Sequence, residues 1–394
     1  MRPVAILGGG PYAARLCEVL ASWPDMPALE LRLHARDRAR LDVIATHAAR
    51  RVAGTHAVRA CGELDDALTG AEVVVLLIRV GGMAARDHDE RFPVRFGLVG
   101  DEGVGVGGMA NAWRTLPVLD ELAARISACT PHAHVLNLMA PLGVTTRLLV
   151  ERGHRTVGLC ELPAVTRRRW TEAAGDPAAP PVSYAGLNHL GFLWSAGTPA
   201  EDHPVLCAAV DSGAVPREIM RRFDAAPLHY LIDVFAAPGR RRVGRAGELA
   251  ELHRGLIEEF SARPGAVIEA VDRRATPWFQ HALAPALHAV LGGPAFVGTL
   301  DLPNAGRLAE VPAAVVIELD GCLTADDATL GSVPARPPAV RDMLASLATA
   351  EDALYHAARG RDRKLLEQAV DTLPLEVTST DMRPLLEAIC EQVA

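Results

Sequence analysis

Long apolar runs, aromatic residues and blocks of basic charge are all scarce in this chain. Aromatic side chains make up 4% of the sequence, and no apolar run approaches the roughly 18 residues that a membrane-spanning helix needs. The formal net charge is −8, without the long basic block typical of a nucleic-acid-binding surface. We therefore expect a globular protein with no membrane or nucleic-acid partner.

Neither a disulfide framework nor a signal peptide is predicted. The seven cysteines are odd in number and widely scattered, as in proteins of a reducing compartment, and the first residues lead directly into an apolar strand. These features predict a cytoplasmic protein. With 394 residues, of which 49% are hydrophobic, the chain is longer than an average domain. We expect two closely packed lobes, residues 1–165 and 166–394.

A dinucleotide-binding fingerprint opens the first lobe. The apolar run 3–7 stops at Gly8-Gly9-Gly10-Pro11-Tyr12-Ala13, which matches G-x-G-x-x-G/A, and apolar residues at helical spacing follow. Glycines let the backbone approach a pyrophosphate whose charge faces the N-terminus of the next helix. We predict a strand, a tight turn and a helix, with Gly8, Gly10, Pro11 and Tyr12 at the cofactor. A glycine-rich turn without a ligand is the alternative.

The ribose of such a cofactor is usually read by an acidic residue at the end of the second strand. That acid is missing here, because Ala35 and Arg36 follow the predicted strand 31–34 and Asp37 comes only after them. Asp37 could reach the ribose, Arg36 could meet a 2′-phosphate, or the adenosine end could be held loosely. Arg36 could equally be a solvated loop charge. NAD is therefore the expected cofactor, with NADP not excluded.

Alternating strand and helix patterns predict an α/β fold. A continuous apolar run of the kind found in doubly covered parallel sheets occupies 73–78, and 135–139 and 156–159 are predicted to be two more parallel strands. The glycine-rich segment 100–108 between the first two is predicted to be an irregular loop at the ligand crevice. Further helices are expected at 246–262, 279–291 and 339–371, strands near 295–300 and 313–318, and surface loops at 174–181 and 330–338. We expect a Rossmann-like, doubly wound parallel sheet followed by a mixed α/β substrate lobe.

Six motifs follow one another along the chain. They are residues 78–90, Gly107-Gly108, residues 114–118, Gly158-Leu159-Cys160, Gly186-Leu187-Asn188-His189 and Leu302-Pro303-Asn304-Ala305-Gly306. In this order, from the fingerprint to about residue 340, the chain resembles glycoside hydrolase family 4. That family contains NAD- and manganese-dependent phospho-glucosidases and α-galactosidases. The resemblance implies NAD, Mn²⁺ or another divalent metal, and a homodimer or homotetramer.

The resemblance also assigns roles to individual residues. Cys160 and His189 match the family's two protein metal ligands, which leave coordination positions open for substrate oxygens, as a catalytic site requires. Tyr230 matches the catalytic base, and Ile78 is expected beside the cofactor. Because a free phenol titrates near pH 10, a nearby metal or cation must lower its pKa before it can act as a base. A buried core tyrosine is the alternative for Tyr230.

Substrate contacts are implied for three further residues. Arg86 and Arg245 match arginines that hold substrate phosphate in the phospho-sugar branch, a task that suits the guanidinium fork. Both could instead be helix-surface arginines, and Arg245 ends the basic cluster 240–245. Asn188, which precedes the metal-binding histidine, is also expected at the substrate.

Two positions depart from the family pattern. Ala140-Pro141 stands where the family has Asn-Pro, so a polar contact with sugar and cofactor is lost. Glu161 stands where the family has Asp or Asn, and aspartate there protonates the leaving group in α-specific members. Glu161 could do the same, meet a cationic substrate group, or form a salt bridge with Arg167 or Arg168. We therefore expect a divergent member of the family.

The implied chemistry is redox-neutral overall. NAD⁺ takes a hydride from C3 of the sugar, the tyrosine removes the acidified C2 proton, the C1 substituent leaves, water adds and the hydride returns. We expect an NAD- and metal-dependent glycosidase acting on a glycoside that could be phosphorylated. A sugar or cyclitol dehydrogenase or epimerase with the same site is the alternative, and a non-catalytic dinucleotide sensor is the third. The sequence does not identify the sugar, the anomer or the leaving group.

Overall fold

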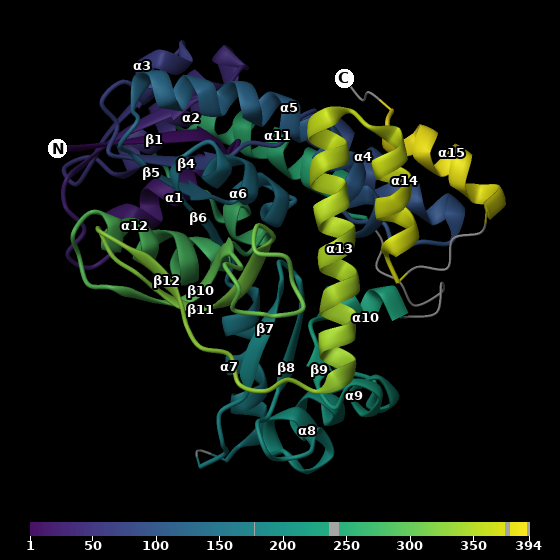
Figure 1. The fold of residues 1–394 in the computed structure, drawn as a ribbon. Helices are drawn as coiled ribbons and strands as arrows, with labels where there is room; N and C mark the ends of the chain where they lie inside the picture. Colours follow the sequence, from purple (N-terminus) through teal and green to yellow (C-terminus); the bar gives the residue numbers. More distant parts are fainter. Residues whose placement is uncertain (177, 236–243, 375–378, 392–394) are drawn as a thin grey trace.

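One mixed sheet runs through the molecule (Figure 1). The computed structural model describes residues 1–176, 178–235, 244–374 and 379–391. Its strands lie in the order β3-β2-β1-β4-β5-β6-β10-β11-β7-β8-β9, and β12 pairs with β11. The strands are β1 (Arg2–Gly8), β2 (Leu29–His34), β3 (Ala57–Ala60), β4 (Val73–Leu77), β5 (His134–Asn137), β6 (Arg155–Leu159), β7 (Ser183–Leu187), β8 (Leu190–Trp194), β9 (Ala226–Pro227), β10 (Phe296–Pro303), β11 (Val316–Leu323) and β12 (Ala328–Leu330).

The first six strands form a parallel, doubly wound sheet. Their order, 3-2-1-4-5-6, is that of dinucleotide-binding Rossmann folds. This confirms the predicted fold class. The helical segments of this part are α1 (Tyr12–Ala21), α2 (Arg38–Arg51), α3 (Leu64–Leu68), α4 (Gly82–Arg91), the 3₁₀ turn η1 (Pro93–Phe96), α5 (Gly105–Cys129), α6 (Leu142–Glu151) and α7 (Leu162–Ala174).

Both faces of this parallel sheet are buried. Along β1, Val4 and Ile6 enter one apolar core, whereas Ala5 and Leu7 enter a second core on the opposite face. Because successive side chains of a strand point to opposite faces, a strand covered on both sides needs apolar residues throughout. This explains why the short run 3–7 predicts a strand although its residues do not alternate in polarity.

An antiparallel half continues the sheet beyond β6. β10 pairs antiparallel with β6, so no gap in the sheet marks the predicted division at residue 165, which stays a prediction. The helical segments of this half are η2 (Ala200–Asp202), α8 (Pro204–Asp211), α9 (Arg217–Phe223), α10 (His229–Phe235), α11 (Ala246–Ala262), η4 (Glu269–Arg273), the π-helical turn η5 (Phe279–Leu283), α12 (Ala284–Val290), α13 (Pro338–Gly360), α14 (Arg363–Thr372) and α15 (Ser379–Ile389). None of the described helices has the length and apolar character needed to cross a membrane.

The long helix α13 connects the two halves. It runs along one side of the molecule (Figure 1) and contacts α5 and α6 of the first half and β7 and α9 of the second. The prediction of one helix over 339–371 is wrong, because the chain reverses at Arg361, whose φ is 55°. The side chain of Asp362 then accepts hydrogen bonds from two backbone N–H groups and begins α14.

Candidate active site

The fingerprint folds as the predicted strand, turn and helix. Gly8, Gly9 and Gly10 have φ values of 88°, 87° and 54°, which side chains with a β-carbon rarely adopt. A β-carbon on Gly8 would lie 2.8 Å from the carbonyl oxygen of Leu77 and 3.0 Å from the Cα of Ile78. The first glycine therefore lets β1 lie directly against the end of β4, which places Ile78 at the turn that precedes α1.

The ribose end of the fingerprint offers a basic rather than an acidic side chain. Asp37 caps α2, where its carboxylate accepts the backbone N–H of Arg40 at 3.1 Å and pairs with the guanidinium of the same arginine. Arg36 is exposed and forms no ion pair with any residue in the described ranges. The carboxylate nearest the predicted ribose position is thus already engaged.

Four charged side chains cluster beside the fingerprint. Arg79 donates to both carboxylate oxygens of Glu102, at 2.5 and 2.7 Å, and Arg86 approaches the same carboxylate at 2.9 Å. Arg274 has no ion-pair partner in the described part of the chain. Burial and the positive charges of Arg79 and Arg86 lower the pKa of Arg274 to about 10. Two carboxylates, Glu102 and the Glu90 that also binds Arg86, thus face three guanidinium groups, and the remaining positive charge favours an anion.

Arg274 lies over the first residue of α1. Its guanidinium carbon is 5.1 Å from the ring centroid of Tyr12 and the same distance from that of Trp278. His253 also packs on Tyr12, with ring centroids 5.6 Å apart. Burial and the neighbouring arginines lower the pKa of His253 to about 4, so this imidazole is neutral at neutral pH. The uncompensated charge of Arg274 thus stands at the helix N-terminus that the fingerprint offers to phosphate.

Glu90 links Arg86 to the start of α11, the helix that follows Arg245. Arg86 donates to one oxygen of Glu90 at 2.7 Å, and the N–H of Ala246, which begins α11, donates to the other at 2.8 Å. This bridge brings Arg86 close to the first turn of α11. The side chain of Arg86 is only 14% exposed and is held by Glu90 and Glu102, whereas that of Arg245 is 55% exposed. Of the basic cluster 240–245, residues 240–243 lie outside the described residues.

The predicted metal pair meets at one buried carboxylate. Cys160 follows β6, and His189 belongs to the two-residue turn between β7 and β8. Glu318 on β11 hydrogen-bonds with the Cys160 thiol and accepts the backbone N–H of His189. In the described ranges, no group of three or more histidine, cysteine or acidic side chains is arranged to hold a metal. A divalent ion at Cys160 and His189 would therefore keep open positions, which fits a catalytic site.

His189 carries backbone strain. Its φ of 66° places a residue with a β-carbon in the left-handed region, at a cost of about 1–3 kcal/mol that surrounding interactions must offset. Such strain concentrates at functional sites. Burial raises the pKa of the Cys160 thiol well above its usual value, and a metal binds the thiolate rather than the thiol. The strain at His189 thus marks a functional candidate, whereas a cation at Cys160 would have to stabilise the thiolate against the effect of burial.

Tyr230 packs directly on the imidazole of His189. The two rings are stacked, with centroids 4.3 Å apart and planes inclined by 5°. Gly103 lies on the same imidazole, since a β-carbon there would be 3.8 Å from its Nδ1 and 3.3 Å from an oxygen of Asp101. The segment 101–103 thus connects the arginine-bound Glu102 with the predicted ligand and base.

Glu161 forms no ion pair with the described residues. Arg167 binds Asp320 at 2.6 Å, and Arg168 approaches Glu172 at 3.9 Å, so the structure contradicts one of the three alternatives for Glu161, a salt bridge with either arginine. Glu161 begins α7 directly after Cys160, and burial raises the pKa of its carboxyl group. A carboxyl group whose pKa is raised is better suited than an ordinary surface glutamate to donate a proton as a general acid.

Ala140 lacks the side-chain amide of the family's asparagine, but its backbone carbonyl accepts a hydrogen bond from Asn111. The side-chain amide of Asn111 donates to the carbonyl oxygens of Ala140, at 3.0 Å, and of Glu102, at 2.9 Å. Asn111 therefore ties the segment after β5 to the segment 101–103. Asn188, predicted at the substrate, donates its amide to Glu318 at 2.8 Å.

Two buried carboxylates were missed by the sequence reasoning. Asp301 and Glu318 face each other across β10 and β11 and have no exposed surface. Burial and the neighbouring carboxylate raise the pKa of Asp301 well above its usual value, and burial raises that of Glu318 to about 7 although several donors hold it down. The available signal was an acid inside an apolar run, as Glu318 is in residues 315–319.

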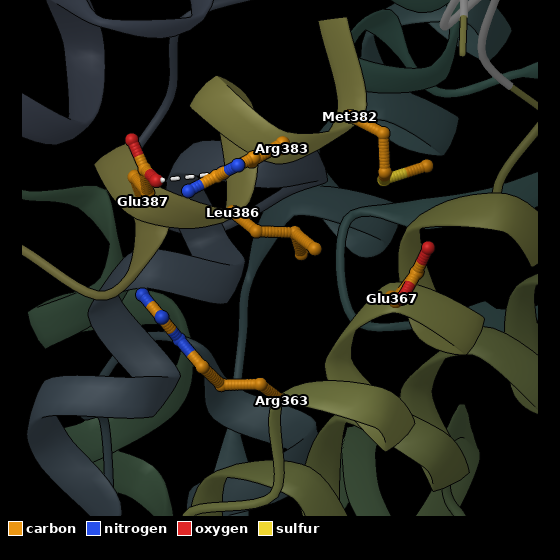
Figure 2. A pocket seen from close by; sticks show the side chains of 6 residues that line it. All are labelled: Arg363, Glu367, Met382, Arg383, Leu386 and Glu387. Atoms are coloured by element: carbon orange, nitrogen blue, oxygen red, sulfur yellow. Dashed lines mark hydrogen bonds and ion pairs between the residues drawn. The ribbon is translucent and has the colours of Figure 1, made fainter. Parts of the chain in front are cut away.

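A hollow of about 350 Å³ lies away from these residues, between α14 and α15 (Figure 2). Its walls carry both signs of charge and contain none of the predicted site residues. They consist of Arg363, Glu367, Met382, Arg383, Leu386 and Glu387. The hollow therefore adds nothing to the candidate active site.

The chain is similar in sequence and fold to several known proteins. A Bacillus subtilis relative described as a probable 6-phospho-beta-glucosidase is 23% identical, covering 99% of this chain and 96% of the relative. An Escherichia coli 6-phospho-beta-glucosidase is 24% identical, covering 84% and 81%. A solved Thermotoga maritima 6-phospho-beta glucosidase with manganese, NAD+ and glucose-6-phosphate shares the fold with a TM-score of 0.84 and 21% identity, over 99% of this chain and 97% of the other.

Two family models match consecutive parts of the chain. The model of the family 4 glycosyl hydrolases covers residues 3–175. That of the family 4 glycosyl hydrolase C-terminal domain covers residues 184–375. The chain therefore belongs to family 4 of the glycosyl hydrolases.

Proposed function

We propose that this protein is an NAD- and divalent-metal-dependent glycosidase that acts by transient oxidation of its sugar at C3 followed by elimination across C1 and C2. The stacked rings of His189 and Tyr230 carry the proposal, because they place a candidate base against a candidate ligand. Glu318 links the same turn to Cys160. The free state of all seven cysteines supports a cytoplasmic site of action. A homodimer or homotetramer remains part of the proposal.

The cofactor site is proposed at the fingerprint. Gly8, Gly9 and Gly10 leave space for a diphosphate at the N-terminus of α1, and Arg274 over Tyr12 adds a positive charge. The related Thermotoga maritima enzyme was solved with NAD+ and manganese. Cys160 and His189 would hold the divalent ion in this chain.

The bound cofactors would supply a hydride acceptor for C3 and a Lewis acid for the sugar oxygens. The residues of this chain move the protons. Tyr230 takes the C2 proton as the bond from C1 to the leaving oxygen breaks, and Glu161 donates a proton to that oxygen. Water then adds across the resulting C1–C2 double bond, with Glu161 accepting a proton from water and Tyr230 returning one to C2. Return of the hydride to C3 and of a proton to its oxygen would restore the C3 hydroxyl, so that each group ends in its starting state.

A phosphorylated glycoside is the proposed substrate class. Arg245 is more than half exposed, and Glu90, which binds Arg86, accepts the backbone N–H of the next residue, Ala246. Because Glu90 and Glu102 already neutralise much of the charge of Arg86, Arg245 is the arginine expected to bind the phosphate directly. The related enzymes described above are 6-phospho-glucosidases, which supports the same class.

Screening the purified protein against glycosides, phosphoglycosides and free sugars, with NAD⁺ and Mn²⁺, tests this proposal. We expect cleavage of a phosphoglycoside that requires both additions, and loss of most activity with EDTA or in Cys160→Ser. The matched variant Cys207→Ser changes a thiol far from the motif and should keep full activity. Full activity of the chelated enzyme and of Cys160→Ser would overturn the metal assignment. Accumulation of NADH from a free sugar, without cleavage, would favour the dehydrogenase or epimerase alternative.

A further inference from the structure

Glu318 is the common partner of four groups around the candidate metal pair. Its carboxylate accepts hydrogen bonds from the Tyr184 hydroxyl and, at 2.8 Å, from the side-chain amide of Asn188. It also interacts with the Cys160 thiol and with the backbone N–H of His189. The side chain has no exposed surface. A carboxylate so enclosed persists only if donors surround it, so these four contacts define where it lies.

Two of the four contacts hold the turn that carries His189. The turn between β7 and β8 consists of Asn188 and His189, and Glu318 binds the side chain of the first and the backbone of the second. The second has a φ of 66°, which the turn keeps only while neighbouring groups fix it. The direction of the imidazole therefore depends on the carboxylate of Glu318.

Strand register places Glu318 where both candidate ligands can be reached. Glu318 pairs with Gly186 on β7, and Gly186 pairs with Gly191 on β8. A β-carbon on Gly191 would collide with the ring and hydroxyl of Tyr184. The missing side chain at Gly191 thus leaves room for the ring of Tyr184, whose hydroxyl donates to Glu318.

We propose that Glu318 is the positioning residue of the metal pair: it holds the Cys160 thiol and the Asn188-His189 turn in one arrangement, so that thiol and imidazole can bind the same divalent ion. This inference rests on the proposed function, because it presupposes that Cys160 and His189 are ligands. Groups that orient metal ligands commonly change metal affinity by 10–100-fold when they are removed.

Titration of the purified full chain with Mn²⁺, without sugar or NAD, tests the proposal through the electron paramagnetic resonance signal of the free ion. Glu318→Gln keeps the size of the side chain but replaces one acceptor oxygen by an amide. We expect it to weaken Mn²⁺ binding by about 10–100-fold. Asp320→Asn is the matched control, since this acid lies two residues along β11 and pairs with Arg167 instead. The control should bind Mn²⁺ like the wild type.

A crystal structure of metal-free Glu318→Gln gives a second readout. We expect His189 to leave the left-handed region in this variant. Retention of a φ near 66°, or Mn²⁺ affinity equal to that of the wild type, would overturn the positioning role. If Glu318→Gln does not fold, Tyr184→Phe removes a single donor and should weaken Mn²⁺ binding about fivefold. Unchanged affinity in that variant would overturn the proposal equally.

The same titration separates this inference from the proposed function. A wild-type protein that binds no Mn²⁺ would contradict the metal-dependent function and with it the positioning role. If the wild type binds Mn²⁺ and Glu318→Gln binds it equally tightly, the proposed function stays intact and only the role of Glu318 is contradicted.

Discussion

The phenol ring of Tyr230 lies parallel to the imidazole of His189, with 4.3 Å between their centroids. Tyr230 belongs to α10, and His189 belongs to the turn between β7 and β8. The short strand β9, which pairs with β8, precedes α10. Stacking keeps the phenol ring against the imidazole that we propose as a metal ligand. A cation bound close to the phenol would favour the phenolate, which is the form of tyrosine that accepts a proton.

Removal of Arg274 should weaken cofactor binding. Its charge is not compensated by an ion pair in the described part of the chain and lies over Tyr12 at the start of α1. A charge-assisted contact with the diphosphate is worth about 1.5–3 kcal/mol, so Arg274→Ala should raise the Kd for NAD⁺ by roughly 10–100-fold. Isothermal titration calorimetry measures this. The exposed neighbour variant Arg273→Ala should bind normally, and equal affinity of both variants would place the diphosphate elsewhere.

Discrimination between NAD⁺ and NADP⁺ should be weak. Asp37 is engaged in capping α2, and Arg36 is exposed at the end of β2. We expect the two Kd values to differ by no more than about tenfold, and Arg36→Ala to weaken NADP⁺ more than NAD⁺. Arg50→Ala, at the far end of α2, is the control. A preference for NAD⁺ above roughly a hundredfold would show that another group reads the ribose.

Binding of the substrate phosphate should depend on Arg245 more than on Arg86. Arg245→Ala should raise KM for a phosphoglycoside about tenfold or more, because an exposed guanidinium can turn toward the phosphate. KM for an unphosphorylated glycoside should not change. Arg254→Ala, on the exposed side of the same helix, should leave both values unaltered. An equal rise of KM for both substrates would mean that Arg245 does not bind phosphate.

Arg86→Ala should act mainly on stability. The variant would leave Glu90 and Glu102 buried with fewer partners, and breaking a buried ion pair costs about 3–5 kcal/mol. Thermal unfolding monitored by circular dichroism would detect the loss. An Arg86→Ala protein as stable as the wild type, with a raised KM for phosphoglycosides only, would mean that Arg86 rather than Arg245 binds the phosphate.

The free energy of unfolding should fall as the pH rises above neutrality, because the buried carboxyl group of Glu351 then ionises. Its carboxyl group lies against Gly143 at the start of α6, where a β-carbon would be 2.5 Å from its oxygen. Burial raises its pKa from 4.5 to about 8, against the lowering effect of Arg147 and with a further raising effect of Asp352. Because the protonated form is favoured in the folded state, its contribution to stability is present below about pH 4.5 and is lost as the pH rises through 8.

The wild-type Tm should therefore fall by a few degrees more between pH 6 and pH 9 than that of Glu351→Gln, as measured by differential scanning calorimetry. Glu367→Gln, an exposed glutamate on α14, should follow the wild type. Parallel Tm profiles of wild type and Glu351→Gln would show that Glu351 is ionised in the folded protein.

Patterns local in sequence predicted the first half of the fold well. The strand, turn and helix of the fingerprint depend on neighbouring residues, and helix α11 begins and ends where its apolar spacing does. The glycine-rich segment 100–108 was predicted wrongly as irregular, since α5 begins at Gly105. A β-carbon on Gly107 would collide with the backbone carbonyls of Asp89 and Asp101, so glycine serves close packing there and overrides its low helix propensity.

The groups around the candidate ligands depend on contacts distant in sequence. Asp301 meets Glu318 only through the register of β10 and β11, and Glu318 reaches His189 only because β11 lies beside β7. No local pattern predicts such a register. Arg274 likewise acquires its position from the fold, which brings the segment after η4 over the first turn of α1.

Turnover in D₂O tests the account most directly, because removal of the C2 proton by Tyr230 leaves an isotopic record in the product. We predict deuterium at C2 of the released sugar, and loss of most turnover and exchange in Tyr230→Phe but not in the control Tyr355→Phe, whose hydroxyl binds the distant Glu151. A base shielded from solvent could return the same proton to C2 and leave no deuterium there. Substrate deuterated at C2 detects this case through an isotope effect on turnover. Product without C2 deuterium in D₂O, together with no isotope effect from the C2-deuterated substrate, would contradict the account.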